Sequence, residues 1–249
     1  MITSRNNALI KTVRSLNEKK VRAERGEYLA EGVKTVAEAI NSSHRVKLII
    51  ATEKGLSLLE SAADITGIPT ETVSDGVFDA ISGDVTPQGV MAVVEKPAAS
   101  MLAPRGNCIF LDGVSDPSNV GAVIRTAAAA GYDEVYLADC ADAYSPKSVR
   151  ASMGGIFRVE IKEGGRESLA EQINLPFYVA DMDGENAFEV HPRGEFCIVV
   201  GSESHGVSEF MKTRAEKTVA VPMLNGMESL NAAVAAGILM YALKNNAVR

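Results

Sequence analysis

The sequence predicts an α/β protein with two domains. Apolar segments of strand length alternate with segments of helical spacing along most of the chain, a pattern typical of α/β folds. In the second half several predicted strands are continuously apolar, which indicates a mostly parallel sheet covered by helices on both faces. Residues 96–106 combine two prolines, a glycine and small residues without a periodic pattern, so they are predicted to be a linker. We therefore predict domains over residues 1–95 and 107–249.

The first domain is predicted to begin with a helix over residues 5–22. Ala8, Leu9, Val13 and Leu16 recur at helical spacing in this segment and would form one apolar face. The segments that follow alternate between strand-like and helix-like patterns. We predict strands at 28–30, 46–51, 70–73 and 89–94, and helices at 33–41, 55–65 and 75–82.

The N-terminal segment is basic, although the chain as a whole is acidic. Residues 1–25 contain seven Lys and Arg residues against two Glu residues, whereas the net charge of the chain is −7. A basic arm on an acidic protein can bind a polyanion locally, which predicts contact with RNA. The alternative is an amphipathic helix whose basic face contacts only water.

The second domain shows the same alternation of elements more strongly. Ser118 is predicted to cap its first helix. The apolar segment from Leu230 to Leu243 is too short to span a bilayer and contains Asn231, so we expect the last helix to lie in a core or a subunit interface. We predict strands at 108–111, 134–138, 157–161, 177–180, 196–200 and 218–221, and helices at 119–130, 146–152, 166–173 and 228–245.

Composition and missing motifs exclude several classes of protein. The chain is 46% apolar and 23% charged, as ordinary globular proteins are. Cys108, Cys140 and Cys197 form no CxxC pair, and the N-terminus has no apolar signal segment. We therefore predict free, buried thiols and a cytoplasmic location. The chain contains neither of the common nucleotide-binding motifs, GxGxxG and GxxxxGK[ST]. Its three histidines lack metal-ligand spacing, so we predict no metal site.

Loops that contain glycine follow three predicted strands of the second domain. Gly201 follows one strand, and the segments 181–184 and 222–226 follow two others. Ligands of open parallel sheets bind outside the carboxyl ends of the strands, where glycine lets the backbone approach closely. Together these loops predict a pocket that recognises an adenosine through main-chain groups, although ordinary turn chemistry would explain any single loop.

Arg125, Ser229 and Asn231 are candidates of a different kind. Arg125 lies in the middle of a mostly apolar helix, where a cation requires an anionic partner. That partner is either a phosphate, which a guanidinium binds with two hydrogen bonds, or a protein carboxylate. Helix capping would explain Ser229 or Asn231, but not both.

Several segments resemble the SpoU (TrmH-type) branch of the SPOUT RNA methyltransferases, over about residues 107–246. Residues 1–95 also resemble the family's small substrate-binding domain, with less specific motifs. Two residues depart from the common pattern: Ser202 replaces asparagine, and Ser204 replaces a glycine whose backbone angles would cost a serine about 1 kcal/mol. The matching segments are Asp112-Gly113 with DPSNVGAVIRTA (116–127), PKSVRASMG (146–154), VGSESHGVS (200–208), and VPM (221–223) with ESLNAAVA (228–235).

The resemblance implies a fold and an activity that the residue patterns alone do not. The second domain would contain a deep trefoil knot near its C-terminus, and the protein would be a homodimer with S-adenosylmethionine as cofactor. The predicted reaction is methylation of a ribose 2′-hydroxyl in RNA; ribosomal RNA is favoured because the small basic N-terminal domain is similar to that of the family's ribosomal-RNA members. Matched by motif, the cofactor would be lined by Gly201, Val221, Met223 and Leu230, and the catalytic or site-shaping positions would be Arg125, Asn119, Glu203, Ser229 and Asn231.

Three alternatives remain open at the sequence level. Transfer RNA is the rival substrate within the same family. A non-catalytic RNA-binding protein of this fold is disfavoured because Arg125, Glu203 and Asn231 are intact. An enzyme that acts on a small molecule is disfavoured because no nucleotide fingerprint is present, whereas the family motifs occur in order.

Overall fold

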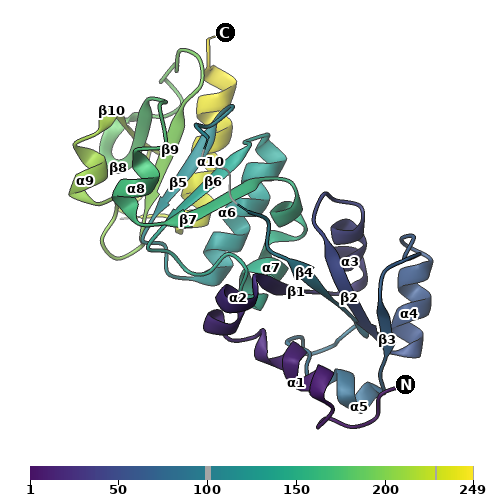
Figure 1. Ribbon diagram of the computed structural model, residues 1–249. Coiled ribbons are helices and arrows are strands. Elements are labelled where there is room, and N and C mark those ends of the chain that lie inside the picture. The colour runs from purple at the N-terminus through teal and green to yellow at the C-terminus, as the bar shows by residue number, and fades with distance from the viewer. Residues whose placement is uncertain (99–101, 228, 249) are drawn as a thin grey trace. The chain divides into compact units, whose positions relative to one another are not determined.

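The computed structural model describes residues 1–98, 102–227 and 229–248. These residues form two compact units, each with its own sheet (Figure 1). The first unit contains residues 1–98 together with the segment Tyr144–Phe157, and the second contains the rest. The central part of the predicted linker, residues 99–101, lies outside the described residues. The grouping of Tyr144–Phe157 with the first unit is a structural finding that the sequence did not indicate.

The first unit is built on a four-stranded mixed sheet. The strand order is β1-β4-β2-β3, with β4 antiparallel to both β1 and β2, and β2 parallel to β3. In Figure 1, helices α3 and α4 lie on one side of this sheet, and α1 and α5 on the other. The strands are β1 (Glu27–Glu31), β2 (Val46–Ala51), β3 (Thr70–Thr72) and β4 (Val90–Glu95), and the three helices after β1 are α3 (Val33–Ile40), α4 (Glu53–Glu60) and α5 (Asp75–Phe78).

Two short helices replace the single N-terminal helix predicted over residues 5–22. They are α1 (Ala8–Ser15) and α2 (Lys19–Arg25). The chain turns between them, and the turn is held by Arg22, which is buried and donates from Nη1 to the carbonyl of Leu16 at 2.7 Å. Arg22, one of the seven basic residues of this segment, therefore stabilises the fold and is not available at the surface.

The apolar face of α1 packs into the core of the first unit. Ile10, Val13 and Leu16 are each 1% exposed and join a cluster with Val77 and Phe78 of α5. Val13 and Leu16 were predicted to form the apolar face, whereas Ala8 is exposed and Ile10 takes its place. The N-terminal segment is thus part of the folded unit.

The segment Tyr144–Phe157 packs against the strands and helices of the first unit. It contains α7 (Pro146–Ser152) and a short 3₁₀ turn. The ring of Tyr144 lies 4.9 Å from that of Tyr28 in β1, centroid to centroid, and both side chains are buried. Nη1 of Arg150 lies 3.7 Å from the Glu31 carboxylate. The core of this unit is therefore built from two separate parts of the chain.

The second unit is built on a six-stranded parallel sheet, as predicted. The strand order is β10-β8-β9-β5-β6-β7, and every neighbouring pair is parallel. The strands are β5 (Cys108–Asp112), β6 (Glu134–Ala138), β7 (Glu160–Gly164), β8 (Phe177–Asn186), β9 (Cys197–Gly201) and β10 (Ala215–Ala220).

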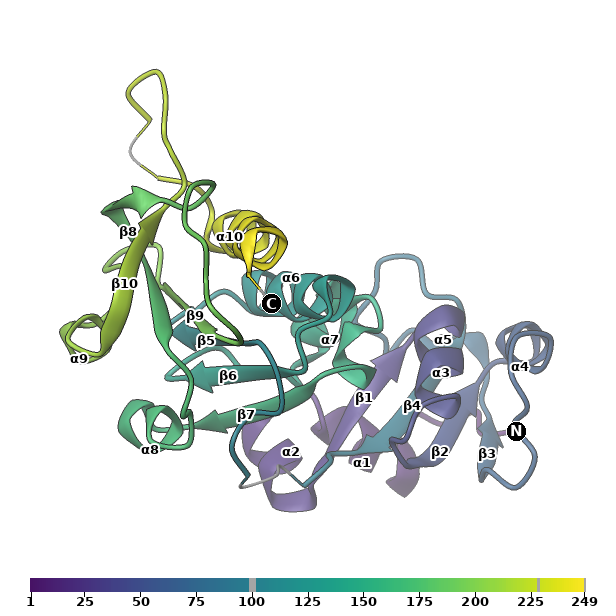
Figure 2. The same cartoon turned by 90° about the horizontal axis from the view of Figure 1, so that it is seen from above.

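Helices cover both faces of the parallel sheet. In Figure 2, α6 (Pro117–Ala130) and α10 (Ala232–Asn246) lie side by side on one face, and α8 (Arg166–Ala170) and α9 (Glu209–Lys212) lie on the other. None of the helices in the described part of the chain is long enough and apolar enough to cross a membrane. Cys108, Cys140 and Cys197 are free thiols; Cys108 and Cys197 are buried, and Cys140 is partly buried.

Both long helices of the second unit begin differently from the prediction. Asp116 rather than Ser118 caps α6, because Pro117 occupies the first helical position and the Asp116 carboxylate accepts from the backbone N–H of Ser118 at 2.8 Å. The helix α10 begins at Ala232 rather than at residue 228, since Asn231 is its N-cap. Glu228 lies outside the described residues.

The strand order reverses direction beside β5. The chain proceeds from β5 outward to β6 and β7, and later fills the other side of β5 with β9, β8 and β10. The ends of β5 and β9 are in register, with Asp112 paired to Gly201. A crevice at such a reversal is where parallel α/β sheets bind ligands.

Candidate functional site

The side chain of Asn119 connects three segments that lie far apart in the sequence. Its Nδ2 donates to Oε1 of Glu203, and its Oδ1 accepts from Nδ2 of Asn231 at 2.9 Å. These residues come from α6, from the loop after β9 and from the N-cap of α10. The structure therefore brings together three of the residues that the sequence nominated as site-shaping; their roles stay predictions.

A cavity of about 480 Å³ lies at the carboxyl ends of β9 and β10 and beside the middle of β8. The four residues nominated for a cofactor, Gly201, Val221, Met223 and Leu230, all line it, and so do Glu203 and Ser229. Its volume falls within the range of about 300–1,000 Å³ that is usual for small-molecule sites.

The loop after β9 folds back on itself along one wall of the cavity. The N–H of Ser202 donates to the carbonyl of Gly206 at 3.2 Å, and the N–H of Gly206 donates to the carbonyl of Ser202 at 2.9 Å. A Cβ on Gly201 would lie 2.0 Å from the backbone carbonyl carbon of Gly206, so only glycine permits this approach.

Ser202 and Ser204 are accommodated in this loop without the expected backbone cost. Oγ of Ser202 accepts from the N–H of His205 at 3.2 Å, and Oγ of Ser204 lies 2.8 Å from Nδ1 of the same histidine. Among the described non-glycine residues, a positive φ occurs only at three positions, none of them in this loop: Asp139, Met153 and Asn225. Ser204 therefore does not adopt glycine-like angles.

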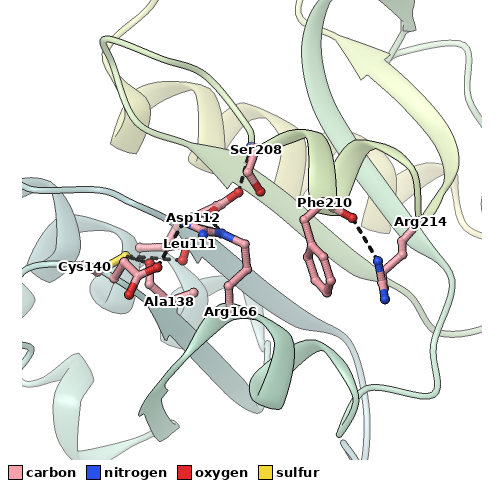
Figure 3. Close-up of polar contacts among 9 residues, drawn as sticks. Leu111, Asp112, Ala138, Cys140, Arg166, Ser208, Phe210 and Arg214 are labelled. Carbon is pink, nitrogen blue, oxygen red and sulfur yellow. Dashed lines mark hydrogen bonds and ion pairs between the residues drawn. The ribbon is translucent and has the colours of Figure 1, made fainter.

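The returning end of the loop is held by Asp112, which is 2% exposed at the end of β5 (Figure 3). One oxygen, Oδ2, accepts from the N–H of Ser208 at 2.8 Å. The other, Oδ1, pairs with Nε of Arg166 at 2.5 Å, and Nη2 of Arg166 also lies 3.1 Å from Asp139. The hydrogen bond to Asp112 raises the pKa of the Arg166 guanidinium. Sequence analysis missed Arg166, since nothing in its local pattern marks it.

A second ion pair lies in the cavity wall itself. Nζ of Lys212 in α9 lies 2.7 Å from Oδ2 of Asp181 in β8, and both residues line the cavity. The hydrogen bond from Lys212 lowers the pKa of the Asp181 carboxyl, and the same bond raises the pKa of Lys212. Residues 181–184 were predicted to be a loop after a strand at 177–180, but the strand β8 continues through them to Asn186, so Asp181 lies within the strand. Lys212 was not identified from the sequence.

The sequence left open whether Arg125 pairs with a protein carboxylate and whether Ser229 or Asn231 caps the last helix. Arg125 is exposed on α6 and forms no hydrogen bond or ion pair with any residue that the structure describes. A carboxylate partner is therefore absent from the described part of the chain. Asn231 is the cap, accepting through Oδ1 from the N–H groups of Ala233 and Val234 at 3.0 and 3.3 Å, while Ser229 faces the cavity instead.

Metal ligands do not gather at this site. Within residues 1–98, 102–227 and 229–248, no group of three or more His, Cys, Asp or Glu side chains is placed to hold an ion. The chemistry available is that of backbone amides, two ion pairs, an amide network and an exposed guanidinium.

Two family models match the chain. The model of the SpoU rRNA Methylase family matches residues 106–241, and that of the MRM3-like substrate binding domain matches residues 7–92. The first match contains every residue of the cavity and amide network discussed above.

The chain is also similar to individual proteins over nearly its whole length. The 23S rRNA (guanosine(2553)-2′-O)-methyltransferase RlmP of Bacillus subtilis (strain 168) is 32% identical over 248 residues, which cover 98% of both chains. A 23S rRNA (uridine(2479)-2′-O)-methyltransferase of Streptomyces viridochromogenes is 27% identical and covers 96% of this chain and 90% of its own length. The AdoMet-bound rRNA methyltransferase from Sinorhizobium meliloti superposes with a TM-score of 0.88 at 25% identity, covering 98% of this chain and 97% of that one.

Proposed function

Because the chain belongs to the SpoU rRNA Methylase family, we propose that it transfers a methyl group from S-adenosylmethionine to a ribose 2′-hydroxyl of ribosomal RNA. The observation that carries this proposal is the convergence of Asn119, Glu203 and Asn231 beside a cavity at the carboxyl edge of the sheet. The names of the relatives, which act on 23S rRNA, support the choice of substrate.

The cavity fits the proposed cofactor. Gly201, Val221, Met223 and Leu230 line it, and the close backbone approach at Gly201 suits a ligand recognised through main-chain groups. S-adenosylmethionine supplies an already activated methyl group, so the protein's task is to align the acceptor oxygen with that methyl group and to exclude competing water. Ser229 and Glu203, which also line the cavity, would shape the entrance for the acceptor.

Arg125 is proposed to hold the RNA rather than to act as a base. Its guanidinium is exposed and has no ion pair with a described residue, so it is available for a phosphate. Arginine stays protonated in proteins, which excludes it as an ordinary proton acceptor. It would grip a phosphate with two hydrogen bonds and polarise the neighbouring 2′-hydroxyl, and the proton would leave to phosphate or water.

The first unit is proposed to choose the RNA site. Its match to a substrate binding domain supports this role. Lys11, Arg14 and Lys19 are exposed and their side chains form no hydrogen bond or ion pair with a described residue, so their charges are available to the RNA backbone. Single-stranded loops with unstacked bases are the expected targets.

A homodimer, a trefoil knot in the second unit and a cytoplasmic location complete the proposal. The groove between α6 and α10, about 730 Å³ in volume, is open and bordered by Val234 and Tyr241, which are 51% and 55% exposed. Apolar side chains on two long, adjacent helices suit a contact with a second copy of the same surface. Free thiols are consistent with a reducing compartment.

Mapping 2′-O-methyl groups in total RNA from cells with and without the gene tests the function. We expect one ribosomal RNA position to lose its methyl group, and wild-type protein to restore it. Arg125→Lys keeps the charge but loses the planar fork, so it should restore less than about 1% of the methylation rate. Arg193→Lys, at another exposed arginine of the second unit, is the matched control and should restore it fully.

Each other outcome has a definite meaning. Loss of a methyl group from transfer RNA alone would replace ribosomal RNA with transfer RNA as substrate. Full restoration by Arg125→Lys would reject the orienting role of Arg125. An unchanged methylation map would overturn the proposed function.

A further inference from the structure

Charged side chains are few in the wall of the cavity. Asp181, Glu203 and Lys212 supply the formal charges, and Glu203 is engaged by the Asn119 amide. Lys212 is the one Lys or Arg among the described lining residues. A ligand that carries a single anionic group therefore meets a single cation in this wall.

The charges of the proposed cofactor all lie outside its adenosine. Its adenosine is neutral, its sulfonium is positive, and its amino-acid tail has one ammonium and one carboxylate. The tail is thus a close pair of opposite charges, and such a pair is matched best by a second close pair of opposite charges. Lys212 and Asp181 are such a pair, with 2.7 Å between Nζ and Oδ2.

Resting on the proposed function, we propose that Lys212 and Asp181 form the subsite for the amino-acid tail of the cofactor. Nζ of Lys212 binds the α-carboxylate, and the Asp181 carboxylate binds the α-ammonium. The two side chains come from α9 and β8, and both reach the cavity. The adenosine half of the ligand is left to the backbone of the loops after β9 and β10.

The position of the pair distinguishes it from an ordinary surface ion pair. Lys217 forms a very similar contact with Glu185, 2.9 Å between Nζ and Oε2, and both lysine side chains are 36% exposed. Neither Lys217 nor Glu185 lines the cavity. Exposed ion pairs of this kind contribute little to stability by themselves. Lys217 is therefore a matched control that shows whether the position of Lys212 in the cavity wall matters.

Calorimetric titration with three ligands tests the assignment. S-adenosylhomocysteine has the complete tail, 5′-methylthioadenosine has none, and decarboxylated S-adenosylmethionine keeps only the ammonium. Lys212→Met should weaken binding of S-adenosylhomocysteine about 10-fold and leave the other two ligands unchanged. Asp181→Asn should weaken decarboxylated S-adenosylmethionine while leaving 5′-methylthioadenosine unchanged. Lys212→Arg should preserve the preference for S-adenosylhomocysteine, and Lys217→Met should alter nothing.

The remaining outcomes would overturn the assignment in distinguishable ways. Equal losses for S-adenosylhomocysteine and 5′-methylthioadenosine in Lys212→Met would mean that the pair supports the adenosine half or the loop. No loss for either ligand would mean that the pair does not face the cofactor. Failure of the wild-type protein to bind S-adenosylhomocysteine at all would overturn the proposed function, and this assignment with it.

Discussion

Asn231 uses the two ends of its side-chain amide for different purposes. Oδ1 caps α10, and Nδ2 donates to Asn119 in the network that reaches Glu203. Only an amide can do both, since a carboxylate lacks the donor and a hydroxyl is too short to bridge. The cap serves stability and the donor serves the arrangement of the site, so the two contributions can be separated by substitution.

Asn231→Asp should therefore keep the fold and lose activity. Aspartate caps helices as well as asparagine does, so the unfolding temperature should stay close to that of the wild type. The lost donor, and the new negative charge near Glu203, should reduce methyl transfer by about 10-fold or more. Asn231→Ala removes the cap as well and should cost about 1 kcal/mol in the free energy of unfolding. Thermal unfolding and tritium transfer measure the two effects; a fully active Asn231→Asp protein would contradict the role of the network.

The loop after β9 is held in place by Asp112, a residue of the neighbouring strand β5. Asp112 binds the N–H of Ser208 and is itself held by Arg166. The loop begins at Gly201 with a close backbone contact and returns at Ser208, so both of its ends are fixed while its middle faces the cavity. This arrangement connects Asp112, which was not nominated as a site residue, to the wall of the cavity.

Asp112→Asn should weaken cofactor binding through this loop. The amide cannot pair with Arg166 as a carboxylate does, so the loop is held less firmly, and we expect the cofactor dissociation constant to rise about 10-fold. Turnover at saturating cofactor should change less than the dissociation constant. Asp139→Asn is the control, because it removes only the exposed second partner of Arg166 and asparagine tolerates the positive φ at that position. Equal cofactor affinity in the two variants would contradict the claim that Asp112 holds the loop in its cofactor-binding shape.

Sequence patterns located most elements, because burial imposes a periodic signal. The continuous apolar strands predicted at 108–111 and 196–200 indicated a parallel sheet, and the structure confirms it with β5 and β9. Contacts between charged residues from different elements impose no such signal, so the partners of Arg166 and Lys212 could not be predicted. Caps fall between these cases: Asp116 and Ser118 are both good caps, and the proline between them decides in favour of Asp116.

At the scale of the whole molecule, the proposed RNA-binding charge and the core share one segment. Deleting residues 1–25 would remove Ile10, Val13 and Leu16 from the core of the first unit, so such a deletion would not test charge alone. Arg22 and Arg25 are also occupied, the first with the Leu16 carbonyl and the second with Glu27. The charges that can be removed without disturbing the fold are those of the exposed residues.

Replacing Lys11, Arg14 and Lys19 together with glutamine should weaken RNA binding and leave cofactor binding intact. If all three contact phosphates, the slope of log affinity against log salt should fall by about 2. Lys54→Gln, on an exposed face of α4, is the control and should change the slope by much less. Filter binding across a salt series measures both, and an unchanged slope in the triple variant would remove these charges from the RNA-binding surface.

The proposed dimer makes an equally direct prediction. Tyr241→Glu introduces a charge on the exposed face of α10 and should convert the protein to a monomer at micromolar concentration. Leu58→Glu, at an exposed leucine of α4 in the first unit, should leave the oligomeric state unchanged. Sedimentation equilibrium distinguishes the two; a wild-type monomer, or a dimer that survives Tyr241→Glu, would contradict an interface on α10.

The placement of Tyr144–Phe157 has a consequence for exchanging parts between related enzymes. The first unit is discontinuous in sequence, so a chimera that received only residues 1–98 from a relative would confront Tyr144 and Arg150 with foreign partners in place of Tyr28 and Glu31. A graft that keeps the core of the first unit intact must therefore carry both stretches of chain.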